Sequence, residues 1–195
     1  MARAVPDTHG EILAAAARQF TVTGYRGTSL QDIAREVGCS KATVLYHFAN
    51  KEALLAELMA PAIDVLRSLD DQLDGLTGAA AQEVAARGFV DLAVRFRQEI
   101  AVLRGEFPEL LCQPAFAHIQ QISDRLRDAL AGHSARPGAQ VAALVLLAGI
   151  SEACAAFVDI PDDELRAALL TLARRAVEPV DAPLPLPPTT EDKDS

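Results

Sequence analysis

Side chains that donate hydrogen bonds are concentrated in one eleven-residue stretch of the sequence. They are Lys41, Thr43, Tyr46, His47 and Lys51, and no acidic side chain lies between positions 41 and 50. Ammonium, hydroxyl and imidazole groups suit the phosphates and base edges of duplex DNA. The stretch is therefore a candidate nucleic-acid contact, although a charge-poor run can also be an ordinary solvated helix face.

Two short helices joined by a tight turn are predicted to position these donors. A capping box of Thr28 and Gln31 predicts the start of the first helix, and Gly38 supplies the left-handed residue that ends it. After Cys39, Ser40 caps a second helix that reaches about residue 47. These lengths are typical of a helix-turn-helix, whose second helix enters the major groove. Such pairs also occur in bundles that bind no DNA, so spacing alone leaves both interpretations open.

Helical periodicity continues through the rest of the chain. Thr8 with Glu11 predicts a first helix that ends near Gly24, and Asn50 caps a helix that continues past Pro61 toward residue 73. Further apolar stripes with helical spacing occur at residues 89–103, 115–130, 141–148 and 165–176. Because no alternating strand pattern appears, the sequence predicts an all-α fold.

Composition and charge agree with this division of the chain. Half of the 195 residues are hydrophobic and only 5% are aromatic, which favours packed helices over a sheet. The net charge of −9 argues against a protein that coats nucleic acid. However, residues 1–60 carry six basic and six acidic side chains, so all nine excess negative charges lie after residue 60.

Several classes of protein are excluded by what the sequence lacks. The cysteines (Cys39, Cys112 and Cys154) are scattered, which excludes a disulfide-stapled or zinc-built domain. The histidines are isolated, and no Gly-x-Ser-x-Gly or phosphate-binding glycine loop occurs. We therefore expect no enzyme, no metal and no cofactor.

A membrane location is also not expected. The longest stretch without polar side chains, residues 141–150, is half of the roughly 20 residues that cross a bilayer. The first residues lack the basic start and apolar centre of a signal peptide. The sequence thus predicts a cytoplasmic protein.

A nearly continuous resemblance to a known family covers the candidate DNA contact. Residues 24–54, GYRGTSLQDIAREVGCSKATVLYHFANKEAL, resemble the N-terminal signature of the tetracycline-repressor (TetR) family of bacterial regulators. The match extends over about residues 8–59. The remainder is similar to the family only in length and in its all-helical pattern.

The resemblance implies a homodimer in which each helix-turn-helix reads one half-site of operator DNA. It implies that Thr28 holds a phosphate, that Lys41, Ala42 and Thr43 form the leading end of the recognition helix, and that Tyr46, His47 and Lys51 contact the backbone or groove edge. Val44 and Phe48 would face inward. The family often has Tyr at the position of Leu45, which offers no phosphate contact. Cys39, where the family commonly has Val, is interpreted as a small buried hydrophobe rather than a redox sensor.

The C-terminal region of the family binds a small-molecule effector in an apolar pocket. The candidate lining residues, each of which could instead be plain core, are Phe89, Leu92, Phe96, Phe107, Phe116, His118, Ile119 and Ile122. The helices from Val141 and from Pro161 are the candidates for an intersubunit four-helix bundle, the alternative being that they form only this domain's own core.

Three segments follow from these observations. Residues 1–52 are predicted to form a three-helix, helix-turn-helix DNA-binding domain, residues 53–177 a helical effector-binding and dimerisation domain, and residues 178–195 a disordered, proline-rich acidic tail. We expect a transcriptional regulator, a repressor released by a small apolar or amphipathic ligand. The alternative is a helical small-molecule-binding protein without sequence-specific DNA binding.

Overall fold

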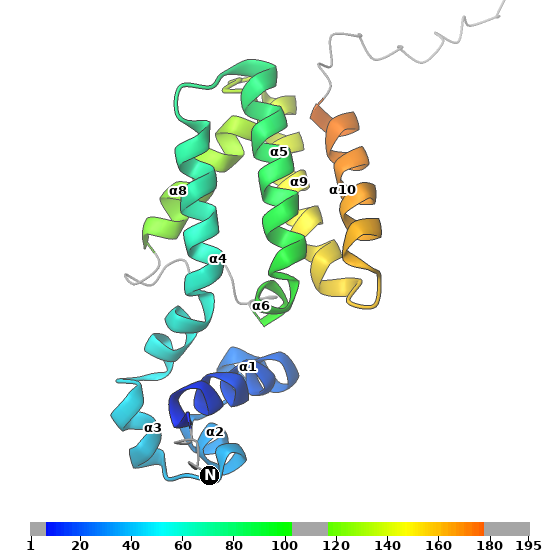
Figure 1. Ribbon diagram of the computed structural model, residues 1–195. Helices are drawn as coiled ribbons and strands as arrows, with labels where there is room; N and C mark the ends of the chain where they lie inside the picture. Colours follow the sequence, from blue (N-terminus) through cyan, green and yellow to red (C-terminus); the bar gives the residue numbers. More distant parts are fainter. Residues whose placement is uncertain (1–6, 103–116, 178–195) are drawn as a thin grey trace, which may run out of the picture.

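The computed structural model describes residues 7–102 and 117–177, and every regular element in these two segments is a helix (Figure 1). The N-terminal helices are α1 (Thr8–Gly27), α2 (Leu30–Val37), α3 (Lys41–His47) and α4 (Lys51–Leu73). The C-terminal helices are α5 (Gly78–Arg95), α6 (Arg97–Val102), α8 (Ala117–Leu130), α9 (Pro137–Ala156) and α10 (Asp162–Val177). The predicted all-α fold is confirmed. The tail predicted for residues 178–195 lies outside the described residues.

The starts of α1 and α2 differ from the sequence prediction by one residue each. The side chain of Asp7, rather than Thr8, caps α1 by accepting a hydrogen bond from the Gly10 N–H at 3.1 Å. Helix α2 has a capping box of Ser29 and Asp32 rather than Thr28 and Gln31. In both places the sequence offers two adjacent residues that can cap a helix, so local chemistry alone did not decide between them. The predicted caps Ser40 of α3 and Asn50 of α4 are confirmed.

Helix α4 connects the two parts of the molecule. Its first half contributes Leu54, Leu55 and Met59 to an N-terminal core with α1, α2 and α3, and its second half contributes Leu69 and Leu73 to a C-terminal core. Pro61 lies inside the helix, as the sequence predicted. Figure 1 shows α4 running from the small N-terminal helices into the larger C-terminal bundle.

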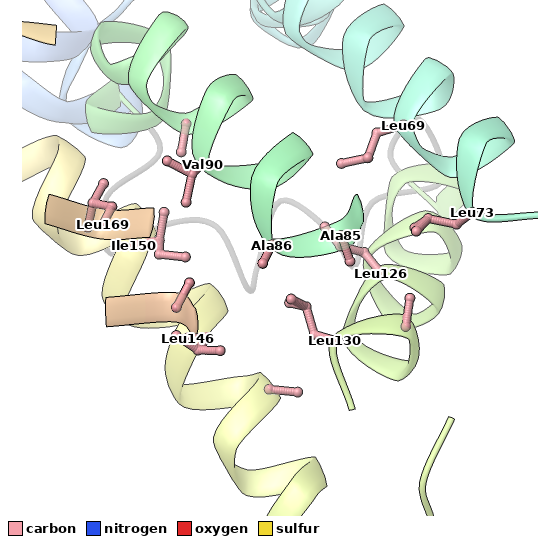
Figure 2. Close-up of a cluster of buried hydrophobic side chains, with 14 of the residues drawn as sticks. Leu69, Leu73, Ala85, Ala86, Val90, Leu126, Leu130, Leu146, Ile150 and Leu169 are labelled. Atoms are coloured by element: carbon pink, nitrogen blue, oxygen red, sulfur yellow. The ribbon is translucent and has the colours of Figure 1, made fainter. Parts of the chain in front are cut away.

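The C-terminal bundle packs around α5, which contacts α4, α8, α9 and α10. Figure 2 shows Val90, Ala85 and Ala86 of α5 facing leucine and isoleucine side chains of these helices. Gly88 lets α4 approach α5, because a Cβ atom there would lie 2.2 Å from Cδ1 of the buried Leu69. The bundle thus has a continuous apolar core of its own.

The N-terminal core does not stop at residue 52, where the sequence placed the domain boundary. It extends along α4 to Ala62 and includes Leu92 of α5 and Phe96 at the start of the turn into α6. Helix α6 also contacts α1 on one side and α9 on another. The two parts are therefore joined by shared apolar packing as well as by the chain itself.

Candidate nucleic-acid interface

The turn between α2 and α3 is fixed by Gly38. This residue has φ 77° and ψ 25°, the left-handed conformation that costs glycine least. The Cys39 N–H donates to the Ala34 carbonyl at 2.9 Å and the Gly38 N–H to the Arg35 carbonyl at 3.3 Å. These bonds satisfy the last carbonyls of α2 and hold α3 at a fixed angle, which confirms the predicted helix end.

The rotation of α3 about its axis is set by two apolar side chains. Val44 is fully buried and Phe48, directly after the helix, is nearly so, and both belong to the N-terminal core. Lys41, Ala42, Leu45 and Tyr46 consequently lie on the solvent side, and the Tyr46 side chain is 86% exposed. We refer to these four residues as the exposed arc of α3. The polar residues of this arc, Lys41 and Tyr46, expose an ammonium and a phenol that could contact a DNA duplex.

Thr43 is tied to the start of α3. Its backbone N–H donates to Ser40 Oγ at 3.0 Å, and its hydroxyl lies 2.9 Å from the same oxygen. The side chain is half-buried. A hydroxyl that donates to Ser40 keeps its lone pairs for a second partner, so contact with a base edge stays compatible with this geometry.

The structure turns the Thr28 side chain away from the predicted phosphate site. Thr28 is only 2% exposed, its hydroxyl donates to the Gly24 carbonyl at 2.9 Å, and it lies 2.7 Å from the Thr23 hydroxyl. A buried hydroxyl with these partners helps to position the joint between α1 and α2, and the phosphate contact of Thr28 stays a prediction. The neighbouring Ser29 is the exposed residue at the N-terminus of α2.

Lys51 is also used inside the chain. Its Nζ donates to the carbonyls of Tyr25 at 2.7 Å and Thr28 at 2.9 Å, and it lies 4.3 Å from the centroid of the Tyr25 ring. An ammonium has three N–H donors, so one is left for a phosphate. Lys51 therefore joins the first turn of α4 to the segment that connects α1 and α2.

His47 lies in an aromatic cluster at the end of α3. Its ring is 5.7 Å from that of His9 and 5.3 Å from that of Tyr46, and the His9 ring stacks on Phe48 at 4.6 Å. His9 Nε2 lies 2.5 Å from Glu57 Oε1 on α4. This cluster links α1, α3 and α4. Within the two described segments, no group of three or more His, Cys, Asp or Glu side chains is placed to hold a metal ion.

Both acidic residues between Arg26 and Lys51 are paired with basic or polar groups. Asp32 accepts hydrogen bonds from the Ser29 hydroxyl and N–H and from Arg35, and these lower the pKa of its carboxyl below 3.8. Gln19, followed by Arg18, lowers the pKa of Glu36 in the same way. These contacts hold Glu36 against α1 and Asp32 against the N-terminus of α2.

The described members of the predicted ligand set are divided between the two cores and the surface. Leu92, Phe96 and Ile119 pack with the N-terminal core and Phe89 with the C-terminal core, while Ile122 is buried and His118 is exposed. Phe107 and Phe116 lie outside the described residues. An open hollow of about 390 Å³ lies elsewhere, on α1 and α2, and its lining is mostly polar: Gln19, Thr23, Gly27, Asp32, Arg35 and Glu36.

Helix α9 carries a stripe of exposed apolar and small residues. Val141, Leu144 and Val145 are each more than half exposed, and the stripe continues through Ala148 and Gly149. In the described part of the chain, α9 is also the one helix long and apolar enough to cross a membrane by length and composition. A core helix of a single subunit would bury this face, and a contiguous exposed apolar face of this kind is typical of an interaction surface.

Helices α2 and α3, with their fixed turn and the exposed arc, define a helix-turn-helix protein. Residues 12–58 match the sequence model of the bacterial regulatory proteins of the tetR family. This match shows that residues 12–58 form an N-terminal domain of the tetR-family type, and the relatives and structures described next are similar to more of the chain.

Two curated relatives are similar to more than half of the chain. The transcriptional repressor KstR2 of Mycobacterium tuberculosis is 27% identical over 134 residues, which cover 63% of this chain and 62% of KstR2. The transcriptional regulator RutR of Escherichia coli K12 is 31% identical over 124 residues, which cover 64% of this chain and 55% of RutR. The chain thus spans less than two thirds of the length of these relatives.

Solved structures extend the likeness to the C-terminal bundle. Mycobacterium smegmatis AmtR aligns with a TM-score of 0.64 and 26% identity, covering 90% of this chain and 88% of AmtR. The ketosteroid transcriptional regulator KstR2 of Mycobacterium tuberculosis aligns with a TM-score of 0.68 and 19% identity, covering 87% of this chain and 94% of KstR2. The second comparison concerns the fold alone.

Proposed function

We propose that the protein is a DNA-binding transcriptional regulator, a repressor that a small apolar or amphipathic ligand releases from its operator. The observation that carries the proposal is the exposed arc of α3, which is held outward by Val44 and Phe48 and lies in the part of the chain that matches the family. The donors Lys41 and Tyr46 on this arc suit phosphates and base edges. The match of residues 12–58 to the tetR-family model supports this function over a ligand-binding bundle without DNA recognition, and over an enzyme.

A homodimer is the second part of the proposal. The exposed stripe of α9 lies beside α10, whose Leu172 is 55% exposed. Two helices from each subunit would form a four-helix bundle that covers these apolar side chains. An isologous dimer also sets two recognition helices about one helical turn of DNA apart, roughly 34–36 Å or more. A subunit partner on α9 agrees with a cytoplasmic protein that does not enter a membrane.

The effector would act by favouring one spacing of the recognition helices over another. A ligand lowers operator affinity only if it binds better to the conformation that fits DNA less well. Helices α4 and α6 support such a coupling, because each contacts both the N-terminal helices and the C-terminal bundle. A coupling of about 1 to 3 kcal/mol would reduce operator affinity roughly 5- to 150-fold.

The proposal is tested by footprinting the full chain on the DNA that flanks its own gene, followed by titration of the protected duplex. We expect a protected palindrome whose affinity falls steeply with salt. Lys41→Ala should weaken binding, whereas Val22→Ala, which changes an exposed aliphatic side chain on α1, should not. Absence of any protected sequence, or equal affinity for random duplex, would refute sequence-specific regulation.

A further inference from the structure

Leu45 is an exposed leucine in the middle of the recognition helix. It is 44% exposed, although the two residues that fix α3 are buried: Val44 directly before it and Phe48 three residues after it. Helix α3 is only seven residues long, so burial of its inward side leaves Leu45 on the outward side whatever the rotamer. The fold of its own subunit therefore leaves nearly half of this large apolar side chain in solvent.

The neighbours of Leu45 on α3 are arranged around it. Lys41 lies four residues earlier and Ala42 three residues earlier, so all three share one face of the helix. Tyr46 is the adjacent exposed residue. The face therefore has two apolar members, Leu45 and Ala42, bordered by an ammonium and a phenol. A plain solvated face would have polar side chains at these positions.

Duplex DNA presents one strongly apolar group to a helix in the major groove. This group is the C5-methyl of thymine, and aliphatic side chains recognise it by contact instead of by hydrogen bonding. The bordering donors suit the phosphates on either side of the groove. The charge and apolar pattern of the arc together fit this occupant better than an apolar protein surface, which would leave the ammonium of Lys41 without an acceptor.

We propose that Leu45 is a specificity-determining residue that selects thymine in each operator half-site by contact with its C5-methyl group, with Ala42 leaving room for the base. The assignment rests on the proposed function of α3 as a recognition helix. The tyrosine that the family often has at this position can contact a phosphate, whereas an aliphatic side chain cannot. The contact assigned to Leu45 is made to a base instead. Leu45 consequently contributes to the choice among sequences and not to general affinity for DNA.

The test uses operator analogues that differ by single methyl groups. An operator is first selected from random duplexes with the full chain, and each thymine is then replaced in turn by uracil, which removes only the C5-methyl. At the position read by Leu45 we expect the Kd of the parent to rise about fourfold for one half-site and roughly 15-fold for both, as for the exposure of one methyl group per site. Leu45→Ala should bind thymine and uracil operators equally.

Two further variants separate recognition from a general loss of binding. Leu45→Met keeps an apolar side chain of similar volume and should keep the discrimination against uracil. Val22→Ala removes an exposed aliphatic side chain from α1 and should also keep it. The same dependence of Kd on salt in Leu45→Ala and the parent would agree with an apolar contact, since no phosphate contact is lost.

Three results would overturn the assignment. One is a uracil series that leaves the Kd of the parent unchanged at every position. Another is a uracil effect of equal size in Leu45→Ala, and the third is a selected half-site without thymine. If no operator is selected at all, the proposed function itself fails, so the two failures are distinguishable.

Discussion

Lys51, which is predicted to contact DNA, also makes hydrogen bonds inside the chain. The sequence suggested a phosphate contact, whereas in the structure two of its three N–H donors are directed at the carbonyls of Tyr25 and Thr28. The phosphate contact and the hydrogen bonds inside the chain predict different effects when the Lys51 side chain is removed. If the internal hydrogen bonds matter, removal of the side chain lowers the free energy of unfolding. If Lys51 contacts only phosphate, the free energy of unfolding does not change.

Lys51→Ala should therefore destabilise the N-terminal helices as well as weaken DNA binding. Hydrogen bonds to charged groups contribute about 1.5–3 kcal/mol, so a fall of this order in the free energy of unfolding is expected. Affinity should fall for all DNA sequences alike. Urea unfolding and titration at several salt concentrations measure the two effects. An unchanged free energy of unfolding, with a salt slope lower by about one unit, would show that Lys51 acts only on phosphate.

Residue types and spacing were enough to find the recognition helix, but not the partners of each donor. Val44 and Phe48 face inward as expected, because two large apolar side chains four residues apart define the buried side of a short helix. The orientation of Thr28 could not be predicted. It depends on the Gly24 carbonyl and the Thr23 hydroxyl, which a non-helical bend in α1 at Gly24 brings into reach.

At the scale of the element, the start of α2 is held by a capping box that also depends on pH. Ser29 donates to Asp32 and in turn caps the helix. The sequence contained two candidate boxes one residue apart. The burial of Thr28 decided between them, and burial belongs to the tertiary structure and not to the local sequence.

Ser29→Ala should lower the free energy of unfolding by about 1 kcal/mol, the usual contribution of a helix cap. Because Thr28 is already engaged with Gly24, it cannot replace the lost cap. Thr28→Ser is the matched control, since it keeps the hydroxyl. Thermal unfolding at neutral pH measures both. No change in Ser29→Ala would show that the backbone N–H groups of α2 are equally well satisfied by water.

The same box predicts a loss of stability in acid. The pKa of Asp32 is held below 3.8 by its hydrogen bonds, so its contribution is present above that value and is lost as the pH falls through the lower, folded pKa. Asp32→Asn should therefore reduce the loss of stability as the pH falls through and below the ordinary pKa range of an aspartate. The pKa of Glu36 is also lowered, so Glu36 still contributes to the pH dependence of the free energy of unfolding in this variant. Identical acid unfolding curves would contradict this role of Asp32.

At the scale of the whole molecule, the sequence pattern selected α9 and α10 for the proposed dimer, but not which of their residues the fold leaves exposed. Leu169 belongs to the same periodic stripe as other leucines of α10, yet it is 5% exposed and packs in the C-terminal core. Val145 of α9 is 63% exposed. The lining of a ligand pocket could not be predicted for a similar reason. The spacing of apolar residues along a helix is the same whether they face a cavity or a packed core.

Val145→Asp should give a folded monomer that no longer binds operator DNA. A charge on the exposed stripe of α9 would be buried without a partner in a dimer but solvated in a monomer. Light scattering at micromolar concentration gives the mass, and circular dichroism gives the helix content. Leu169→Asp is the contrast, because a charge in the core should unfold the bundle. A monomeric parent would contradict the dimer.

Pro61 has a mechanical consequence for the whole protein. Proline has no N–H, so the carbonyl of Glu57 one turn earlier receives no helical hydrogen bond from it. The two ends of α4 are anchored in different cores, and the missing hydrogen bond lies between these ends. The part beyond Pro61 reaches roughly 18 Å to Leu73 at about 1.5 Å per residue. A shift of the C-terminal bundle would therefore be expected to bend α4 near Pro61 and so to rotate the N-terminal helices.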